Sequence, residues 1–202
     1  MARQERARNK TKGLRTHGNR PLRQSFLIFC QGQTEVGYFS SFRKRAKFIG
    51  GGDALATVAN AIAYKNYHEK PYDQYWVVFD KDETSHEDFN AAVNQAMQNG
   101  IQVAWSNQAF ECWIIMHFRN FSHACHRNNY EALLRTYLPW YNAGEKGEAQ
   151  GKKFFEETVH LIETAIQHAR DGHDSFEGHI SPAHRETGSR VYELIGAIRA
   201  NS

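Results

Sequence analysis

YWVVFDKDE (75–83) is the stretch that decides the fold. Its first five residues are apolar, and a short apolar run of this kind bounded by polar residues is typical of a buried strand. SFLIFC (25–30) and IQVAW (101–105) have the same character, and a brief strand is expected near 46–49. Helical segments separate these runs. The alternation predicts an α/β fold with a largely parallel sheet and helices on both faces.

Helices are expected between the strands and throughout the second half of the chain. The first is predicted over about 35–47 with Thr34 as its N-cap, and Asp53 is predicted to cap the second. After residue 120 the strand pattern disappears, and the remainder is predicted to be helical. The other helices are expected at about 86–99, at AFECWIIMHF (109–118), at NNYEALLRTYLPWY (128–141) as far as its proline, at KKFFEETVHLIETAIQHAR (152–170) and at SRVYELIGAIRA (189–200).

Four acidic residues stand where the strands end or where the following helices begin. Glu35 follows the first strand, Asp80 and Asp82 follow YWVVF, and Glu111 lies early in the helix after the last strand. Ligands of open α/β sheets bind at the carboxyl ends of the strands. Carboxylates gathered there repel one another unless they share a cation, and oxygen ligands of this kind suit Mg²⁺ or Mn²⁺. The spacing therefore predicts one metal site.

Each acid also has an interpretation that needs no metal. Asp80 and Asp82 would face the same way on extended backbone, but a DxD sequence is also common in solvated turns. Glu35 either interacts favourably with the helix dipole or faces the DxD as a ligand or general base. Glu111 has apolar neighbours, so it either points to solvent or is paired or bound to metal.

Charge is distributed unevenly along the chain. The 202 residues carry a net charge of +3, yet residues 1–23 contain eight Lys or Arg and one acid, so this arm carries +7 and the remainder −4. The arm has almost no apolar content, so we expect it to be flexible. It is either a contact for nucleic-acid phosphates or a solvated tail. Its basic residues are Arg3, Arg6, Arg8, Lys10, Lys12, Arg15, Arg20 and Arg23.

The sequence lacks the signals of several classes of protein. No apolar run approaches the roughly 20 residues that cross a bilayer, and the N-terminus is too charged for a secretory signal. We therefore expect a cytoplasmic protein with no membrane partner. The three cysteines form no CxxC pair, and the His and Cys residues between 117 and 126 match no standard zinc spacing. No P-loop or nucleophile-elbow motif is present.

Three segments in series resemble the RloB-like family, within the wider group of TOPRIM-fold proteins. They are FCQGQTEVGYF (29–39), WVVFDKDE (76–83) and SNQAFECWIIMHF (106–118), and SPAHRETGSRVYELI (181–195) is similar to the C-terminal element of that family. The resemblance covers roughly residues 25–198. It implies a four-stranded parallel TOPRIM core flanked by helices, with an acidic Mg²⁺ or Mn²⁺ site. We expect a basic arm (1–23), a TOPRIM-like core (24–120) and a helical C-terminal part packed on the core (121–202).

The resemblance also implies roles for the acids. Asp80 and Asp82 match the DxD ligands of the family, Glu35 the second acid of its first motif, and Glu111 the acid of its third. The TOPRIM pattern has a glutamate directly after the first strand, where this chain has Gln31. An amide keeps an oxygen donor but carries no charge and cannot act as a general base. RloB-like proteins are associated with bacterial restriction and anti-phage loci, often beside a partner ATPase.

Three functions are consistent with these observations. The first is a metal-dependent nuclease that cleaves DNA or RNA in anti-phage defence, with the four acids holding the ions and the arm contacting the nucleic-acid backbone. The second is a catalytically degenerate TOPRIM module that binds nucleic acid or a partner ATPase without cleaving, which Gln31 suggests. The third is a sensor of a small phosphorylated ligand bound at the helix starts.

Overall fold

The computed structural model describes residues 23–50, 52–68, 71–121, 126–174, 181–184 and 188–201. The predicted basic arm lies outside the described residues except for Arg23, which is exposed. None of the described helices is both long and apolar enough to cross a membrane.

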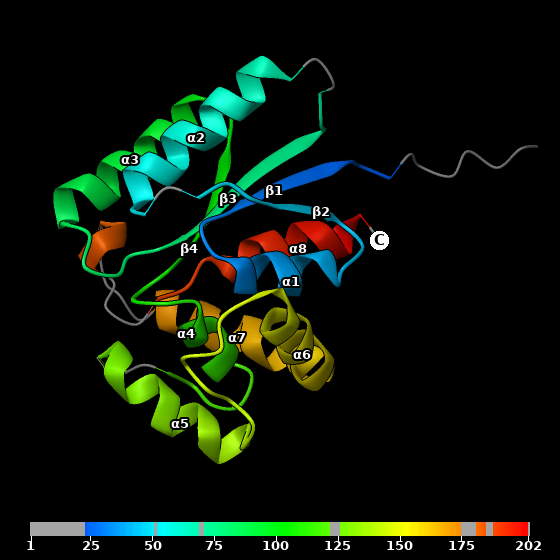
Figure 1. The fold of residues 1–202 in the computed structure, drawn as a ribbon, viewed down its shortest axis with the longest axis vertical. Helices are drawn as coiled ribbons and strands as arrows, with labels where there is room; N and C mark the ends of the chain where they lie inside the picture. Colours follow the sequence, from blue (N-terminus) through cyan, green and yellow to red (C-terminus); the bar gives the residue numbers. More distant parts are fainter. Residues whose placement is uncertain are drawn as a thin grey trace, which may run out of the picture.

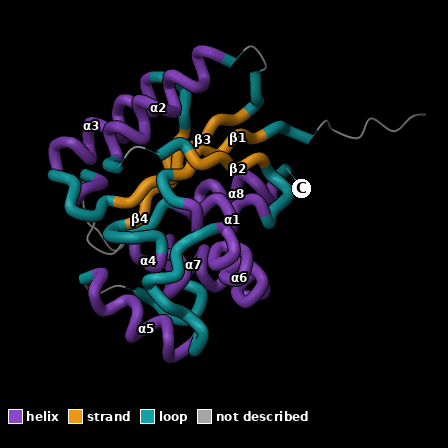
Figure 2. Tube along the Cα trace, viewed as in Figure 1, coloured by secondary structure: helices purple, strands orange, loops and turns teal. Residues whose placement is uncertain are grey.

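A parallel sheet forms the centre of the described structure (Figures 1 and 2). Its four strands are β1 (Phe26–Cys30), β2 (Arg45–Phe48), β3 (Gln74–Asp80) and β4 (Gln102–Ser106). They pair in the order β2-β1-β3-β4, and every pairing is parallel. The carboxyl ends of the strands therefore lie at one edge. This confirms the predicted α/β fold and its parallel sheet.

Helices cover both faces of the sheet (Figure 1). Those of the described residues are α1 (Gln33–Ser40), α2 (Ala54–Tyr67), α3 (His86–Gln98), α4 (Glu111–Ile115), α5 (Tyr130–Tyr137), α6 (Glu148–Thr158), α7 (Ile162–Asp174) and α8 (Val191–Ala200), with short 3₁₀ turns at Arg127–Asn129, Val159–Leu161 and Pro182–His184. Figure 1 shows α2 and α3 on one face, α1 and α8 on the other, and α4 to α7 beyond these two.

Alternating side chains of the strands fill two separate apolar layers. Leu27 and Phe29 of β1 pack with α2 and α3, whereas Phe26, Ile28 and Cys30 pack with the helices of the other face. All five side chains are buried, which explains why this strand reads as a continuous apolar run. The predicted cap of α2 is also confirmed, because the Asp53 carboxylate accepts a hydrogen bond from Ala56 N at 2.7 Å.

The first helix differs from its prediction at both ends. It begins at Gln33 after Gly32, so Thr34 lies inside the helix and is not its N-cap. It ends at Ser40, and Arg43 adopts a left-handed backbone with φ 59°, which turns the chain into β2. The predicted extension to residue 47 is therefore wrong, because residues 45–48 gain backbone pairing with β1.

Two later helices also differ in length. The segment predicted as one helix over 152–170 forms α6 and α7 with a 3₁₀ turn between them, and α7 continues to Asp174. The apolar residues of this segment keep helical spacing across the 3₁₀ turn, so the hydrophobic pattern did not reveal that two helices are present. The helix predicted over 109–118 is α helical only from Glu111 to Ile115 and continues as turns.

The chain returns to β4 immediately before α8. Asn107 N donates to Gly188 O at 2.9 Å and Arg190 N donates to Trp105 O at 2.8 Å. Between these bonds Ser189 forms an antiparallel bridge with Ser106, the last residue of β4. The C-terminal segment therefore fixes the backbone that leads from β4 to Glu111.

Two glycines allow α1 and α6 to touch at their backbones. A Cβ atom on Gly151 would overlap the carbonyl oxygen of Thr34 and would lie 2.7 Å from Tyr38 N. A Cβ atom on Gly37 would overlap the carbonyl oxygen of Glu148 in the same way. Backbone atoms cannot move aside as the end of a side chain can. The contact between the first helix and the C-terminal helices therefore requires glycine on both sides.

We expect Gly151→Ala to lower the free energy of unfolding by about 1–3 kcal/mol or more, because the added methyl group overpacks this crossing. Urea unfolding followed by circular dichroism measures the change. Gly196→Ala in α8 is the matched control, since apart from its chain neighbours and the backbone of its own helix no atom of the described residues lies within 4 Å of its Cβ position. The control should be stabilised by about 0.5–1 kcal/mol through helix propensity. Equal stabilities for the two variants would contradict the close crossing.

Candidate metal centre

A cavity of about 270 Å³ lies at the carboxyl ends of the strands. All four acids predicted from the sequence line it: Glu35, Asp80, Asp82 and Glu111. Gln31 and Lys146 line it as well. The parallel sheet thus brings together acids that are up to 76 positions apart in the sequence.

Three of the acids are placed by the starts and ends of regular elements. Asp80 is the last residue of β3 and Glu111 the first residue of α4. Glu35 lies in the first turn of α1 and is buried, with 5% of its surface exposed. Its carboxylate lies over Gly32, where a Cβ atom would be 3.0 Å from Oε1 and would overlap Oε2. Glycine at position 32 therefore makes room for this carboxylate.

Burial and mutual repulsion favour protonation of two of these carboxyl groups. The pKa of Glu35 is raised to about 7, chiefly by burial and in part by the negative charge of Glu111, while its own backbone N–H and Lys146 oppose the shift. Burial likewise raises the pKa of Asp80 well above its usual value, with Glu35 and Glu111 adding to the effect. The acids are therefore close enough to disfavour one another's charge.

One oxygen atom of Asp80 has no hydrogen-bond partner among the described residues. Its Oδ1 is buried and accepts no hydrogen bond from the described residues. Leaving a buried carboxylate oxygen unpaired is unfavourable. A bound cation would supply the missing interaction.

Asp82 does not have the extended backbone predicted for it. It lies beyond the end of β3 in a turn, with a left-handed φ of 44°, and its N–H donates to Gln108 O at 2.9 Å. Its carboxylate forms an ion pair with Arg127. The extended backbone predicted for Asp80 and Asp82 is therefore wrong, because the strand ends at Asp80, although both residues line the cavity.

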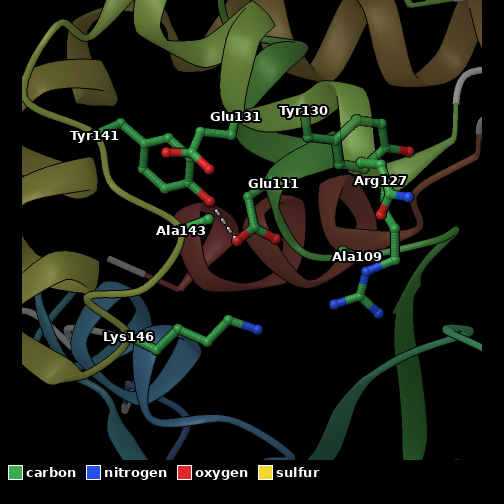
Figure 3. Close-up of a pocket in the computed structure, with 9 residues that line it drawn as sticks. Ala109, Glu111, Arg127, Tyr130, Glu131, Tyr141, Ala143 and Lys146 are labelled. Atoms are coloured by element: carbon green, nitrogen blue, oxygen red, sulfur yellow. Dashed lines mark hydrogen bonds between the residues drawn. The ribbon is translucent and has the colours of Figure 1, made fainter.

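Glu111 is held by a residue that the sequence analysis missed. Tyr141 O–H donates a hydrogen bond to Glu111 Oε1 at 2.8 Å (Figure 3). Burial and then the charge of Glu111 raise the pKa of Tyr141, so the phenol keeps its proton. Tyr141, Arg127 and Lys146 come from the segment between α4 and α6, in which no sequence motif marked them.

Gln31 is bonded through both ends of its amide. Its Oε1 accepts a hydrogen bond from Asp80 N at 2.9 Å, and its Nε2 donates to Gly52 O at 3.2 Å. A glutamate could accept the first bond but an ionised one could not donate the second. The amide thus joins the end of β1 to the end of β3 and to the loop before α2.

The carboxylate oxygens of the four acids are suitable ligands for a divalent cation, but the acids are not arranged as a formed metal site. Within the described residues, no group of three or more His, Cys, Asp or Glu has the arrangement of a formed metal site. Arg127 holds Asp82 and Tyr141 holds Glu111, which leaves Glu35 and Asp80 as the pair without such a partner. Their hard carboxylate oxygens and the unpaired Asp80 Oδ1 fit Mg²⁺ or Mn²⁺. A third ligand would require a change in one of the two held side chains.

Comparison with known proteins gives one family. The family model described as RloB-like protein matches residues 26–198. No curated protein and no solved structure matches the chain.

The raised pKa of Glu35 predicts a loss of stability as pH increases in EDTA. Below about pH 4.5 this carboxyl group is protonated in both states, whereas between about 4.5 and about 7 only the unfolded chain releases its proton. The free energy of unfolding of the wild type should fall across this window by about 3 kcal/mol relative to Glu35→Gln. Urea unfolding at a series of pH values measures the difference. Glu156→Gln is the control, because Glu156 is exposed, and its stability should change with pH as that of the wild type does. If the stabilities of Glu35→Gln and the wild type change in parallel with pH, the raised pKa of Glu35 is excluded.

Proposed function

Because the chain belongs to the RloB-like family, we propose that its acidic centre binds Mg²⁺ or Mn²⁺ and hydrolyses phosphodiester bonds of DNA or RNA in anti-phage defence. The observation that carries this proposal is the buried, unpaired Asp80 Oδ1 beside Glu35 and Glu111. Buried acids whose pKa is raised by burial and by neighbouring carboxylates, as for Glu35 and Asp80, are unfavourable for stability alone and are common at functional sites. A cation would remove their repulsion.

Each residue of the centre has a distinct part in this proposal. Glu35 and Asp80 would be the first ligands, and Glu111 and Asp82 would complete the set when their present partners release them. The metal, when bound, stabilises charge on the phosphate and activates water. Gln31 fixes the backbone of Asp80 through the bond to its N–H.

Partners of the proposed nuclease follow from charge and from the family resemblance. The basic residues of the arm would contact the nucleic-acid backbone and add affinity that decreases with salt. The resemblance supports a partner ATPase encoded nearby, and the proposed location is the cytoplasm.

We expect Asp80→Ala to lower the rate of cleavage by more than about a hundredfold, since even the partners of metal ligands contribute 10- to 100-fold to activity in other proteins. The assay follows labelled single-stranded and duplex DNA and RNA with Mg²⁺, with Mn²⁺ and with EDTA. Glu83→Gln is the matched control, because Glu83 is an exposed acidic residue in the turn that follows Asp80. Equal cleavage by wild type and Asp80→Ala would refute the assignment.

A second function is favoured by the bonds of Gln31. Its amide forms one hydrogen bond as acceptor and one as donor, as expected of a structural residue. Within the described residues, the acids are also not arranged as a formed metal site. We propose as the alternative a module that binds nucleic acid or a partner ATPase without cleaving.

The variant Gln31→Glu separates the two functions. We expect the wild type to bind Mn²⁺ and to cleave, and the variant to lose about 1 kcal/mol of stability because the bond donated to Gly52 O is lost. Calorimetric titration with Mn²⁺, the cleavage assay and urea unfolding measure these quantities. Gln95→Glu, on the exposed side of α3, controls for the added charge. The non-cleaving module is the correct function if the wild type neither binds Mn²⁺ nor cleaves and Gln31→Glu does both.

A further inference from the structure

A second cavity adjoins the acidic one and is less acidic, because its lining holds Arg127 and Lys146 beside Glu111 and Glu131. It has a volume of about 390 Å³ and shares Glu111 and Lys146 with the first cavity. Arg127 and Tyr141 also line it. Most of its lining comes from residues 127–146, which follow the predicted TOPRIM-like core. The segment after the core therefore forms one wall of a cleft that leads to the acids.

Lys146 reaches into this cleft without a partner among the described residues. It lies just before Gly147, the N-cap of α6, and Figure 3 shows its side chain extended into the cavity. No hydrogen bond or ion pair to Lys146 is found in the described part of the chain. Its charge nevertheless lowers the pKa of Glu35, so the ammonium group acts on the acidic centre from the rim.

Arg127 approaches the same space from the opposite side (Figure 3). One of its nitrogens pairs with Asp82, and its charge opposes the raised pKa of Asp80. About 31% of its side chain is exposed. Since a guanidinium group has five N–H donors, the pair with Asp82 leaves donors for a second anion.

We infer that Lys146 and Arg127 bind a backbone phosphate of a nucleic acid in the cleft beside Glu111, an inference that rests on the proposed function. A phosphodiester that approaches the acidic centre meets repulsion from its negative charge, and the two cations line the adjoining cavity beside Glu111. Arginine binds phosphate through paired donors and lysine through a point charge. Residues 127–146 thus position the substrate, while the ends of the strands supply the acids.

Binding of a short fluorescein-labelled oligonucleotide tests this inference. The full chain is titrated at several salt concentrations in EDTA and again in Ca²⁺, and fluorescence anisotropy gives the dissociation constant. Lys146→Ala should weaken binding about tenfold in at least one condition and reduce the slope of log K against log salt by about one. Lys146→Arg should restore both. Arg127→Lys, which keeps the charge opposite Asp82, should weaken binding less than Lys146→Ala.

The matched control is Lys152→Ala, because Lys152 is exposed on α6 and lines neither cavity. The inference is overturned if Lys146→Ala and Lys152→Ala have the same affinity and salt slope in both conditions, or if the wild type binds no oligonucleotide. If circular dichroism shows that Lys146→Ala is unfolded, Lys146→Gln is used in its place. Cleavage by the wild type is a separate readout. If Lys146→Ala loses binding but the wild type does not cleave, this inference is sustained and the nuclease is refuted. If the wild type cleaves but Lys146→Ala binds as Lys152→Ala does, this inference alone is refuted.

Discussion

Burial of mutually repelling carboxyl groups is the constraint on which the rest of this structure depends. Glu35 lies in the first turn of α1 and Asp80 at the end of β3, and burial with neighbouring charge raises the pKa of both. Such an arrangement costs folding free energy. The surrounding residues limit that cost, since Gln31 fixes the backbone of Asp80 and Gly32 leaves room for the carboxylate of Glu35.

The C-terminal helices are tied closely to this centre. Glycines at the crossing of α1 and α6 set the position of the first helix, and the strand-like bonds around Ser189 hold the backbone that leads to Glu111. Arg127 and Tyr141 hold two of the acids directly. A shift in this part of the chain would therefore change which carboxylates are free to meet one cation. The division of the chain at residue 120 stays a prediction.

Regular elements with strong local signals were predictable from the sequence. The strands β1, β3 and β4 are short apolar runs, and Asp53 caps α2 as expected. The gathering of four acids around one cavity also follows from the rule that strand ends share an edge. By contrast, the left-handed turn at Asp82 and the break between α6 and α7 leave no mark in the hydrophobic pattern.

The sequence by itself determined the order of strands and helices and the identity of the acids at the strand ends, because periodicity and capping are local properties of the chain. Only the tertiary structure decided which acids gain a side-chain partner within the described residues. Tyr141 meets Glu111 across 30 positions and Arg127 meets Asp82 across 45, contacts that arise from packing between distant segments. Local patterns carry no information about such contacts, since they depend on how the C-terminal helices pack against the sheet.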